Sequence, residues 1–168
     1  IEQCVVTGGR KVLCIGDLHC PFDLDGYLDF CTDVYQKHIC DTVVFIGDVI
    51  DNHYASYHES DPDGLGGREE LECAIERLAP YYKAFPDAYV TIGNHDRIIM
   101  RKSMTSSVPR RWIKSYAEVL ETPGWKFTDE VSIDEVMYIH GEVGNARIKS
   151  INEMCSVVQG HRHTEMFT

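Results

Sequence analysis

Apolar residues occur along this chain in five short runs, and each run is followed at once by a polar residue that can bind a metal ion. The runs are residues 12–16, 43–47, 89–93, 136–139 and 157–160, and the residues that follow them are Asp17, Asp48, Asn94, His140 and His161. Continuous apolar runs are typical of buried strands in an α/β sheet, and ligands bind beyond the carboxyl ends of such strands. The pattern therefore predicts that these polar groups converge in one crevice and form a metal site.

Two of the stretches between these runs have the spacing of amphipathic helices. Residues 24–39 and residues 71–82 each repeat apolar side chains on one helical face. Strands that alternate with helices predict a largely parallel sheet, covered by helices, with right-handed crossovers. Residues 125–139 are instead interpreted as two or three strands with a turn at residues 128–130, and a last helix is predicted near residues 145–154.

Length and composition favour one globular domain over residues 1–168. The formal net charge of −11 disfavours a protein that holds nucleic acid over a broad basic surface, although bound divalent cations would offset part of that charge, so a nuclease is not excluded. The seven scattered cysteines are interpreted as reduced core thiols. With no apolar stretch of membrane-spanning length and no signal-peptide pattern, we expect a cytoplasmic protein without a membrane partner.

The first two polar positions carry carboxylates. Asp17 and His19 lie two residues apart, so in an extended strand end both side chains point to the same side and could bind one ion. Asp48 follows the next strand, and the two oxygens of a carboxylate can serve different ions. Each residue alone is a weak indication, because a single Gly-Asp pair or a lone histidine is more often a turn or a satisfied polar group.

The later positions add nitrogen ligands. The sequence Asn94-His95-Asp96 places an amide oxygen, an imidazole and a carboxylate together, and that carboxylate is suited to fix the orientation of the imidazole. Three further imidazoles come from His140, His161 and His163. It is the recurrence at five strand ends that makes one shared site the favoured interpretation.

In order, the motifs GDLH, GDVID, GNHD, HG and GHRH resemble those of the calcineurin-like metallophosphoesterase superfamily, and the resemblance extends from Asp17 to His163. It implies an α/β fold in which a sandwich of two mixed sheets is flanked by helices, with a dinuclear metal centre at the strand ends. We adopt this architecture in place of a single sheet. Members commonly continue into further strands, whereas this sequence ends at Thr168, so either the sheet edge is short or the domain is incomplete at its C-terminus.

The resemblance also implies roles for individual residues. One metal would be held by Asp17, His19, Asp48 and His163, and the other by Asp48, Asn94, His140 and His161, with Asp48 bridging. His95 would be the histidine that contacts the phosphate or protonates the leaving oxygen, and Asp96 its orienting partner.

Two cations about 3.5–4 Å apart would polarise the phosphoryl oxygens and lower the pKa of a bridging water, so that a metal-bound hydroxide attacks and no side-chain nucleophile is needed. Oxygen and nitrogen ligands without thiolate favour Mn, Fe, Zn, Co or Ni over Ca or an all-oxygen Mg site. We predict two divalent ions, with manganese first and iron, zinc, cobalt or nickel as alternatives.

The substrate class follows from departures within the motifs. Protein phosphatases of the superfamily usually continue the second motif with Arg-Gly and have GNHE as the third, whereas this chain has Asn52-His53 and GNHD. These differences favour phosphodiesters of nucleotides or nucleic acid. Asn52, His53 and Arg97 are the candidate substrate-binding residues.

Two segments beside the motifs have open interpretations. An acid-free basic stretch begins at Arg97 and either forms a positive wall for a phosphorylated substrate or is a solvated helix face. The polar loop at residues 51–67 carries Tyr54 and Tyr57, which either stack on a base or pack within the loop. Residues 100–120 are a candidate cap.

Three functions remain open at this stage. They are a dinuclear phosphodiesterase, a phosphomonoesterase acting on a small molecule or a phosphoprotein, and a metal-binding scaffold without turnover. A scaffold has no need for a full ligand set together with His95, so the sequence favours an enzyme.

Overall fold

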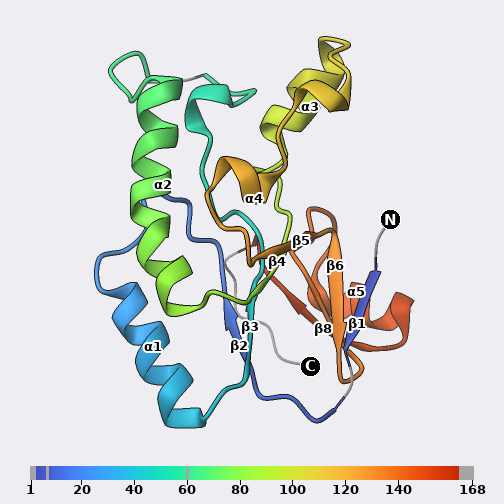
Figure 1. Cartoon of the computed structure of the whole chain (residues 1–168). Helices are drawn as coiled ribbons and strands as arrows, with labels where there is room; N and C mark the ends of the chain where they lie inside the picture. The colour runs from blue at the N-terminus through green and yellow to red at the C-terminus, as the bar shows by residue number, and fades with distance from the viewer. Residues whose placement is uncertain (1–2, 7, 60, 163–168) are drawn as a thin grey trace.

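The computed structural model describes residues 3–6, 8–59 and 61–162 (Figure 1). Its strands are β1 (Gln3–Val6), β2 (Val12–Ile15), β3 (Thr42–Phe45), β4 (Tyr89–Thr91), β5 (Lys126–Thr128), β6 (Glu130–Ile133), β7 (Val136–Ile139) and β8 (Ser156–Gln159). Its helices are α1 (Tyr27–His38), α2 (Gly67–Ala84), α3 (Ile98–Thr105), α4 (Tyr116–Val119) and α5 (Ala146–Glu153), with 3₁₀ turns η1 (His53–Ala55) and η2 (Arg110–Trp112).

The strands form two sheets, as the superfamily resemblance implies. The first has the order β2-β3-β4-β5 and is parallel throughout, while the second has the order β1-β6-β7-β8 and contains one antiparallel pair, β6 with β7. That pair is joined by Asp134 and Glu135 alone, both with positive φ, and a two-residue connection can only join antiparallel strands. The sandwich is therefore confirmed, but only the second sheet is mixed.

The chain passes from one sheet to the other at Asp129. β5 ends at Thr128 in the first sheet and β6 begins at Glu130 in the second. The Thr128 hydroxyl donates to the Glu130 carbonyl over 2.9 Å and braces this corner. The turn expected at residues 128–130 is therefore a change of sheet.

The continuous apolar runs are explained by burial on both faces of the first sheet. In β3, Val43 and Phe45 pack in the core beneath α1 and α2, whereas Val44 and the next residue, Ile46, pack in the core between the two sheets. A strand buried on both sides has no solvent face and therefore no polar alternation. Figure 1 shows α1 and α2 together on the outer side of the first sheet.

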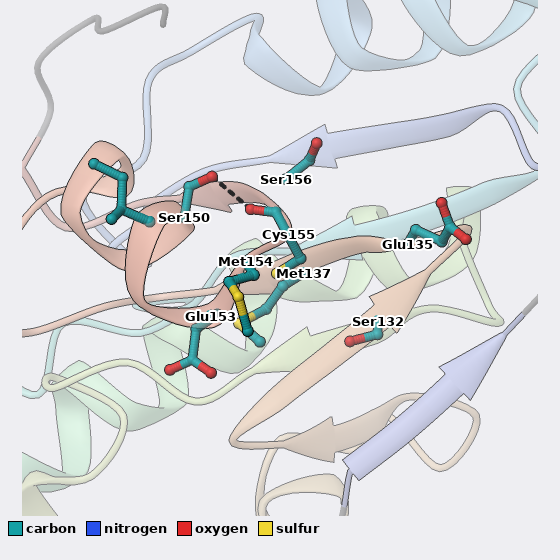
Figure 2. A pocket seen from close by; sticks show the side chains of 9 residues that line it. Ser132, Glu135, Met137, Ser150, Glu153, Met154, Cys155 and Ser156 are labelled. Atoms are coloured by element: carbon teal, nitrogen blue, oxygen red, sulfur yellow. Dashed lines mark hydrogen bonds between the residues drawn. The ribbon is translucent and has the colours of Figure 1, made fainter.

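Helix α5 lies against β8, the edge strand of the second sheet. Beside this helix lies an open hollow of about 970 Å³ whose lining includes Ser132, Met137 and Met154 (Figure 2). None of the predicted metal ligands that the structure describes lines it.

Two further features bear on the sequence interpretation. Cysteines 14, 20, 31, 40, 73 and 155 are free thiols. Over the described residues, no helix combines the length and apolar character that crossing a membrane requires.

Candidate metal centre

The loops that follow β2 and β3 stay paired beyond the strand ends, which brings the first two motifs together. The amide of His19 donates to the Asp48 carbonyl over 2.8 Å, and the amide of Cys20 donates to the Val49 carbonyl over 3.0 Å. These bonds extend the parallel ladder of β2 and β3 into the motif loops. This continuous backbone pairing holds residues 17–19 next to Asp48.

Asp48 lies at the centre of the candidate site and is only 2% exposed. Its Oδ1 accepts the backbone N–H of His95 over 2.8 Å, and its Oδ2 lies 3.1 Å from His140 Nε2 and 3.8 Å from His19 Nε2. Two groups of side chains have ligand atoms within 4.8 Å of one another: His19, Asp48 and His95 in one, and Asp48, His140 and His161 in the other. Both groups share Asp48, the residue expected to bridge.

His140 is fixed in the orientation of a metal ligand. Its Nδ1 lies 2.8 Å from the Ile46 carbonyl oxygen, which can only accept, so Nδ1 carries the proton. Its Nε2 then faces Asn94 Oδ1 at 2.9 Å as well as Asp48. Burial lowers the pKa of His140, but hydrogen bonding and charge from Asp48 outweigh burial and raise it. A backbone carbonyl on one ring nitrogen and oxygen ligands at the other is the arrangement seen at bound metals.

His19 and His95 are both oriented by Asp51. The carboxylate Oδ1 of Asp51 lies 2.7 Å from His19 Nδ1, and its backbone carbonyl lies 2.7 Å from His95 Nδ1. The hydrogen bond to the Asp51 carboxylate raises the pKa of His19. The two imidazoles meet edge to face with ring centroids 4.7 Å apart, so one acidic residue sets the position of both rings.

Asp17 and His161 complete the described part of the cluster. The amide of His161 donates to the Asp17 carboxylate, with distances of 3.2 and 3.3 Å to its two oxygens, and Asp17 Oδ1 lies 3.4 Å from His140 Nδ1. The rings of His140 and His161 have centroids 5.1 Å apart. His163 is the remaining ligand that the family resemblance implies, and it lies outside the described residues.

The Asp96 carboxylate was expected to orient His95, but among the described residues it bonds backbone amides and not the His95 ring. Its carboxylate is 1% exposed and accepts the backbone N–H groups of Gly93, Asp48, Val49 and Ile50 at 2.8 to 3.3 Å. Burial and the nearby charge of Asp48 raise the pKa of Asp96 to about 6, against the opposing effect of these amides. Asp96 thus ties the second motif to the third, and the structure places Asp51 at the orienting position beside His95.

The backbone of the site is held in sparsely populated conformations. Asp17, His19, Asp48 and His161 all have positive φ, between 37° and 69°. Non-glycine residues rarely adopt such angles, and where they do, the surrounding structure must impose them. Four of the predicted ligands share this feature. We infer that the loops adopt these unusual backbone angles to place the ligand side chains.

Gly93 offers a test of how tightly the loops are packed. A Cβ at this position would overlap the carboxylate and the backbone nitrogen of Asp48. We therefore expect Gly93→Ala to displace Asp48, to destabilise the fold by about 1–3 kcal/mol and to weaken Mn²⁺ binding measured by isothermal titration calorimetry. Gly16→Ala is the matched control, since its Cβ would make only ordinary contacts with Ile46. Equal Mn²⁺ affinity in both variants would contradict this packing argument.

The three candidate substrate-binding residues lie in different settings. The Asn52 side chain is buried and donates to the His95 carbonyl over 3.0 Å, so it supports the third motif. His53 is half-buried, and its Nδ1 lies 4.0 Å from Asp51 Oδ2. The Arg97 guanidinium pairs with Glu142 at 2.6 Å and with Asp129 at 3.0 Å, and it also donates to the Ile92 carbonyl. Arg97 is therefore engaged by two acids.

The residues present fit divalent cations. Asp48 and Asp51 are nearly buried carboxylates whose ion pairs within the described chain are with histidines, with no lysine or arginine among them. Buried carboxylates need a compensating charge, and a site of carboxylate, amide and imidazole donors suits Mn, Fe, Zn, Co or Ni.

Asp51 is the functional candidate that sequence reasoning missed. The signal was its place in the GDVID motif, three residues after Asp48 on the same loop.

The family model described as calcineurin-like phosphoesterase matches residues 10–165. A similar solved structure is the cold-active protein-tyrosine phosphatase of a psychrophilic Shewanella species, which is 17% identical, with a TM-score of 0.41. The match covers 89% of this chain and 46% of that one, so the chain spans about half the length of that phosphatase. No curated protein matches significantly. Because the family model covers nearly the whole chain, including every described residue of the candidate centre, this protein belongs to the calcineurin-like phosphoesterase family.

Proposed function

We propose that the protein is a metal-dependent phosphodiesterase that hydrolyses phosphodiesters of nucleotides or nucleic acid. The observation that carries the proposal is the pair of ligand groups that share Asp48, one of which includes the oriented imidazole of His95. Family membership supports phosphoester hydrolysis in general.

The proposed ligands divide between two ions. Asp17, His19, Asp48 and His163 would hold one, and Asp48, Asn94, His140 and His161 the other. Divalent ions held there supply charge for the phosphoryl oxygens and lower the pKa of a coordinated water. Asp51 and the Ile46 carbonyl bond Nδ1 of His19 and His140, so these rings would hold an ion through Nε2. We propose manganese as the native metal, with iron, zinc, cobalt or nickel as alternatives.

His95 is the proposed proton donor to the leaving oxygen. Its Nδ1 is bonded to the Asp51 carbonyl, so Nε2 is the nitrogen available to substrate. The side chain is 32% exposed, which leaves it accessible, while Asn52 fixes the backbone carbonyl of the same residue. A positioned imidazole with one nitrogen directed at the substrate is suited to general acid catalysis.

The surroundings of the centre support a diester in preference to a monoester. A monoester carries an additional negative charge, which a guanidinium at the centre would suit. Asn52 follows Asp51 where the family's protein phosphatases have arginine, and Arg97 is engaged by Asp129 and Glu142. We also propose a cytoplasmic location, which the free thiols of the described cysteines support.

The test is a parallel assay of metal-stripped protein, with Mn²⁺ added back, on bis(p-nitrophenyl) phosphate and p-nitrophenyl phosphate. We expect Mn²⁺ to restore turnover and the diester to be hydrolysed faster, because among the described residues Asn52 bonds the His95 carbonyl and Arg97 pairs with Asp129 and Glu142, so neither is directed at a terminal phosphate dianion. Faster hydrolysis of the monoester would instead identify a phosphatase. No turnover of either compound with Mn²⁺, Fe²⁺, Zn²⁺, Co²⁺ or Ni²⁺ would point to a non-catalytic metal-binding protein.

A further inference from the structure

Five cations are concentrated on α3 and in the segment that leads from it to α4, without compensating acids. They are Arg101, Lys102, Arg110, Arg111 and Lys114, and none of them forms an ion pair with any described residue. No acid occurs between Asp96 and Glu118, and Glu118 is engaged in a capping box with Ser115. In a protein with 27 acidic and 16 basic residues, most cations could find a partner. This segment is therefore a local region of positive potential on an acidic molecule.

Two exposed aromatic residues lie within this region. Trp112 is 81% exposed at the end of η2 and directly follows Arg110 and Arg111. Tyr57 is 55% exposed, and the charged groups of Arg101 and Lys102 each lie 5.3 Å from the centre of its ring. The Tyr57 ring is held by these two cations, whereas Trp112 leaves most of its ring in water, where it is a ready surface for stacking.

The region is anchored to the candidate metal centre at His95. The amide of Ile98, the first residue of α3, donates to the His95 carbonyl over 3.2 Å. The loop that carries Tyr57 starts at Asn52, whose side chain bonds the same carbonyl. Figure 1 shows α3 projecting away from the two sheets, on the side of the molecule where η1 also lies. Two segments therefore start beside His95, the candidate proton donor. One is α3 with the cations that follow, and the other is the loop that carries Tyr57.

We propose that this basic aromatic surface, made of Tyr57, Trp112 and the five cations, binds single-stranded nucleic acid and leads it to the metal centre. The inference rests on the proposed function and adds the path of the substrate. Cations contact successive phosphates and exposed rings stack on unpaired bases, a combination that duplex DNA cannot use because its bases are already stacked. Glu59, Asp61 and Asp63 are exposed farther along the Tyr57 loop, so the strand passes over α3 and η2 and not over the loop tip.

The first test is binding without hydrolysis. A labelled oligothymidine of about 20 nucleotides, longer than the ~4–16 nucleotides that one small binding domain covers, is titrated with metal-stripped protein and followed by fluorescence anisotropy. We expect Trp112→Ala to weaken binding about tenfold or more, because a stacked base is lost. The double variant Arg110→Ala and Arg111→Ala should reduce the salt dependence of log K by about 1.4, since each phosphate contact on a single strand contributes about 0.7.

A matched control uses exposed cations elsewhere on the surface. Lys37→Ala together with Arg147→Ala removes the same charge from α1 and α5 and should leave oligothymidine affinity unchanged. An equal loss in this control would mean that only net charge matters and would overturn the proposal. Equal or tighter binding of duplex DNA would also overturn it, as would binding to phosphatidylserine vesicles without binding to oligothymidine.

The second test separates this proposal from the proposed function. The ratio of oligothymidine cleavage to bis(p-nitrophenyl) phosphate turnover should fall about tenfold in Trp112→Ala. If neither compound is hydrolysed but oligothymidine binding depends on Trp112, the function is wrong and the surface is right. If the small diester is hydrolysed and oligothymidine binding is unaffected by Trp112→Ala, the surface assignment is wrong.

Discussion

Replacing Asp48 by Asn is expected to remove both metal ions together. Asp48 Oδ1 accepts the His95 amide, so an asparagine keeping its one oxygen there would turn its NH₂ group toward His140 Nε2. The NH₂ group would donate a hydrogen bond to His140 Nε2, which the second ion needs as a ligand. The neutral amide would also lack the negative charge that Asp48 would supply to the first ion. Because even outer partners of metal ligands change affinity by about 10–100-fold, we expect Mn²⁺ affinity and diester turnover to fall by at least about 100-fold.

Metal content by mass spectrometry and calorimetric Mn²⁺ titration measure the effect. Asp33→Asn is the matched control, because Asp33 is exposed on α1, and it should retain both ions. Circular dichroism melting of the metal-stripped proteins establishes that Asp48→Asn is folded. Loss of one ion with full retention of the other would show that Asp48 serves a single metal, and the bridging assignment would then be withdrawn.

The strand ends of the candidate site could be predicted from sequence because burial on both faces leaves no charged residue within β2, β3 or β4. The first polar residue after each run then marks the point where the chain leaves the core. Asp17, Asp48 and Asn94 were found in this way, and the structure places all of them around His140.

The division into two sheets could not be derived from the same pattern. Residues 126–128 and 130–133 look alike as short strands, and only the three-dimensional pairing places β5 and β6 in different sheets. β1 was not predicted at all, since a four-residue strand that pairs with β6 far along the chain has no local signal. Here the family resemblance supplied the sandwich that periodicity did not.

The orienting partner of His95 was taken from its neighbour in sequence, and the structure places a different residue there. Asp96 is adjacent to His95, but the chain turns there and directs the carboxylate to the amides of the second motif. Asp51 comes from a different strand end, and no sequence spacing reveals that it meets His95. Likewise, Arg97 finds Asp129 and Glu142, which lie at least 32 positions away.

Replacing His95 by Ala is expected to reduce diester turnover by about 10²–10⁴-fold, the usual range for a general acid, while both metal ions remain bound. The substitution leaves intact the His95 amide that bonds Asp48, because only the side chain is removed. His38→Ala, at the exposed end of α1, is the control and should have wild-type turnover. The comparison uses steady-state rates on bis(p-nitrophenyl) phosphate together with metal content.

Metal content decides between two roles that proximity alone allows for His95. The imidazole lies in one group with His19 and Asp48, so it could also be a ligand. The hydrogen bond from Nδ1 to the Asp51 carbonyl does not distinguish these roles, because it leaves Nε2 available for either a metal or a proton. A ligand would take an ion with it when removed, whereas a proton donor would not. Turnover lost together with one ion would therefore make His95 a ligand, and unchanged turnover would remove it from the mechanism.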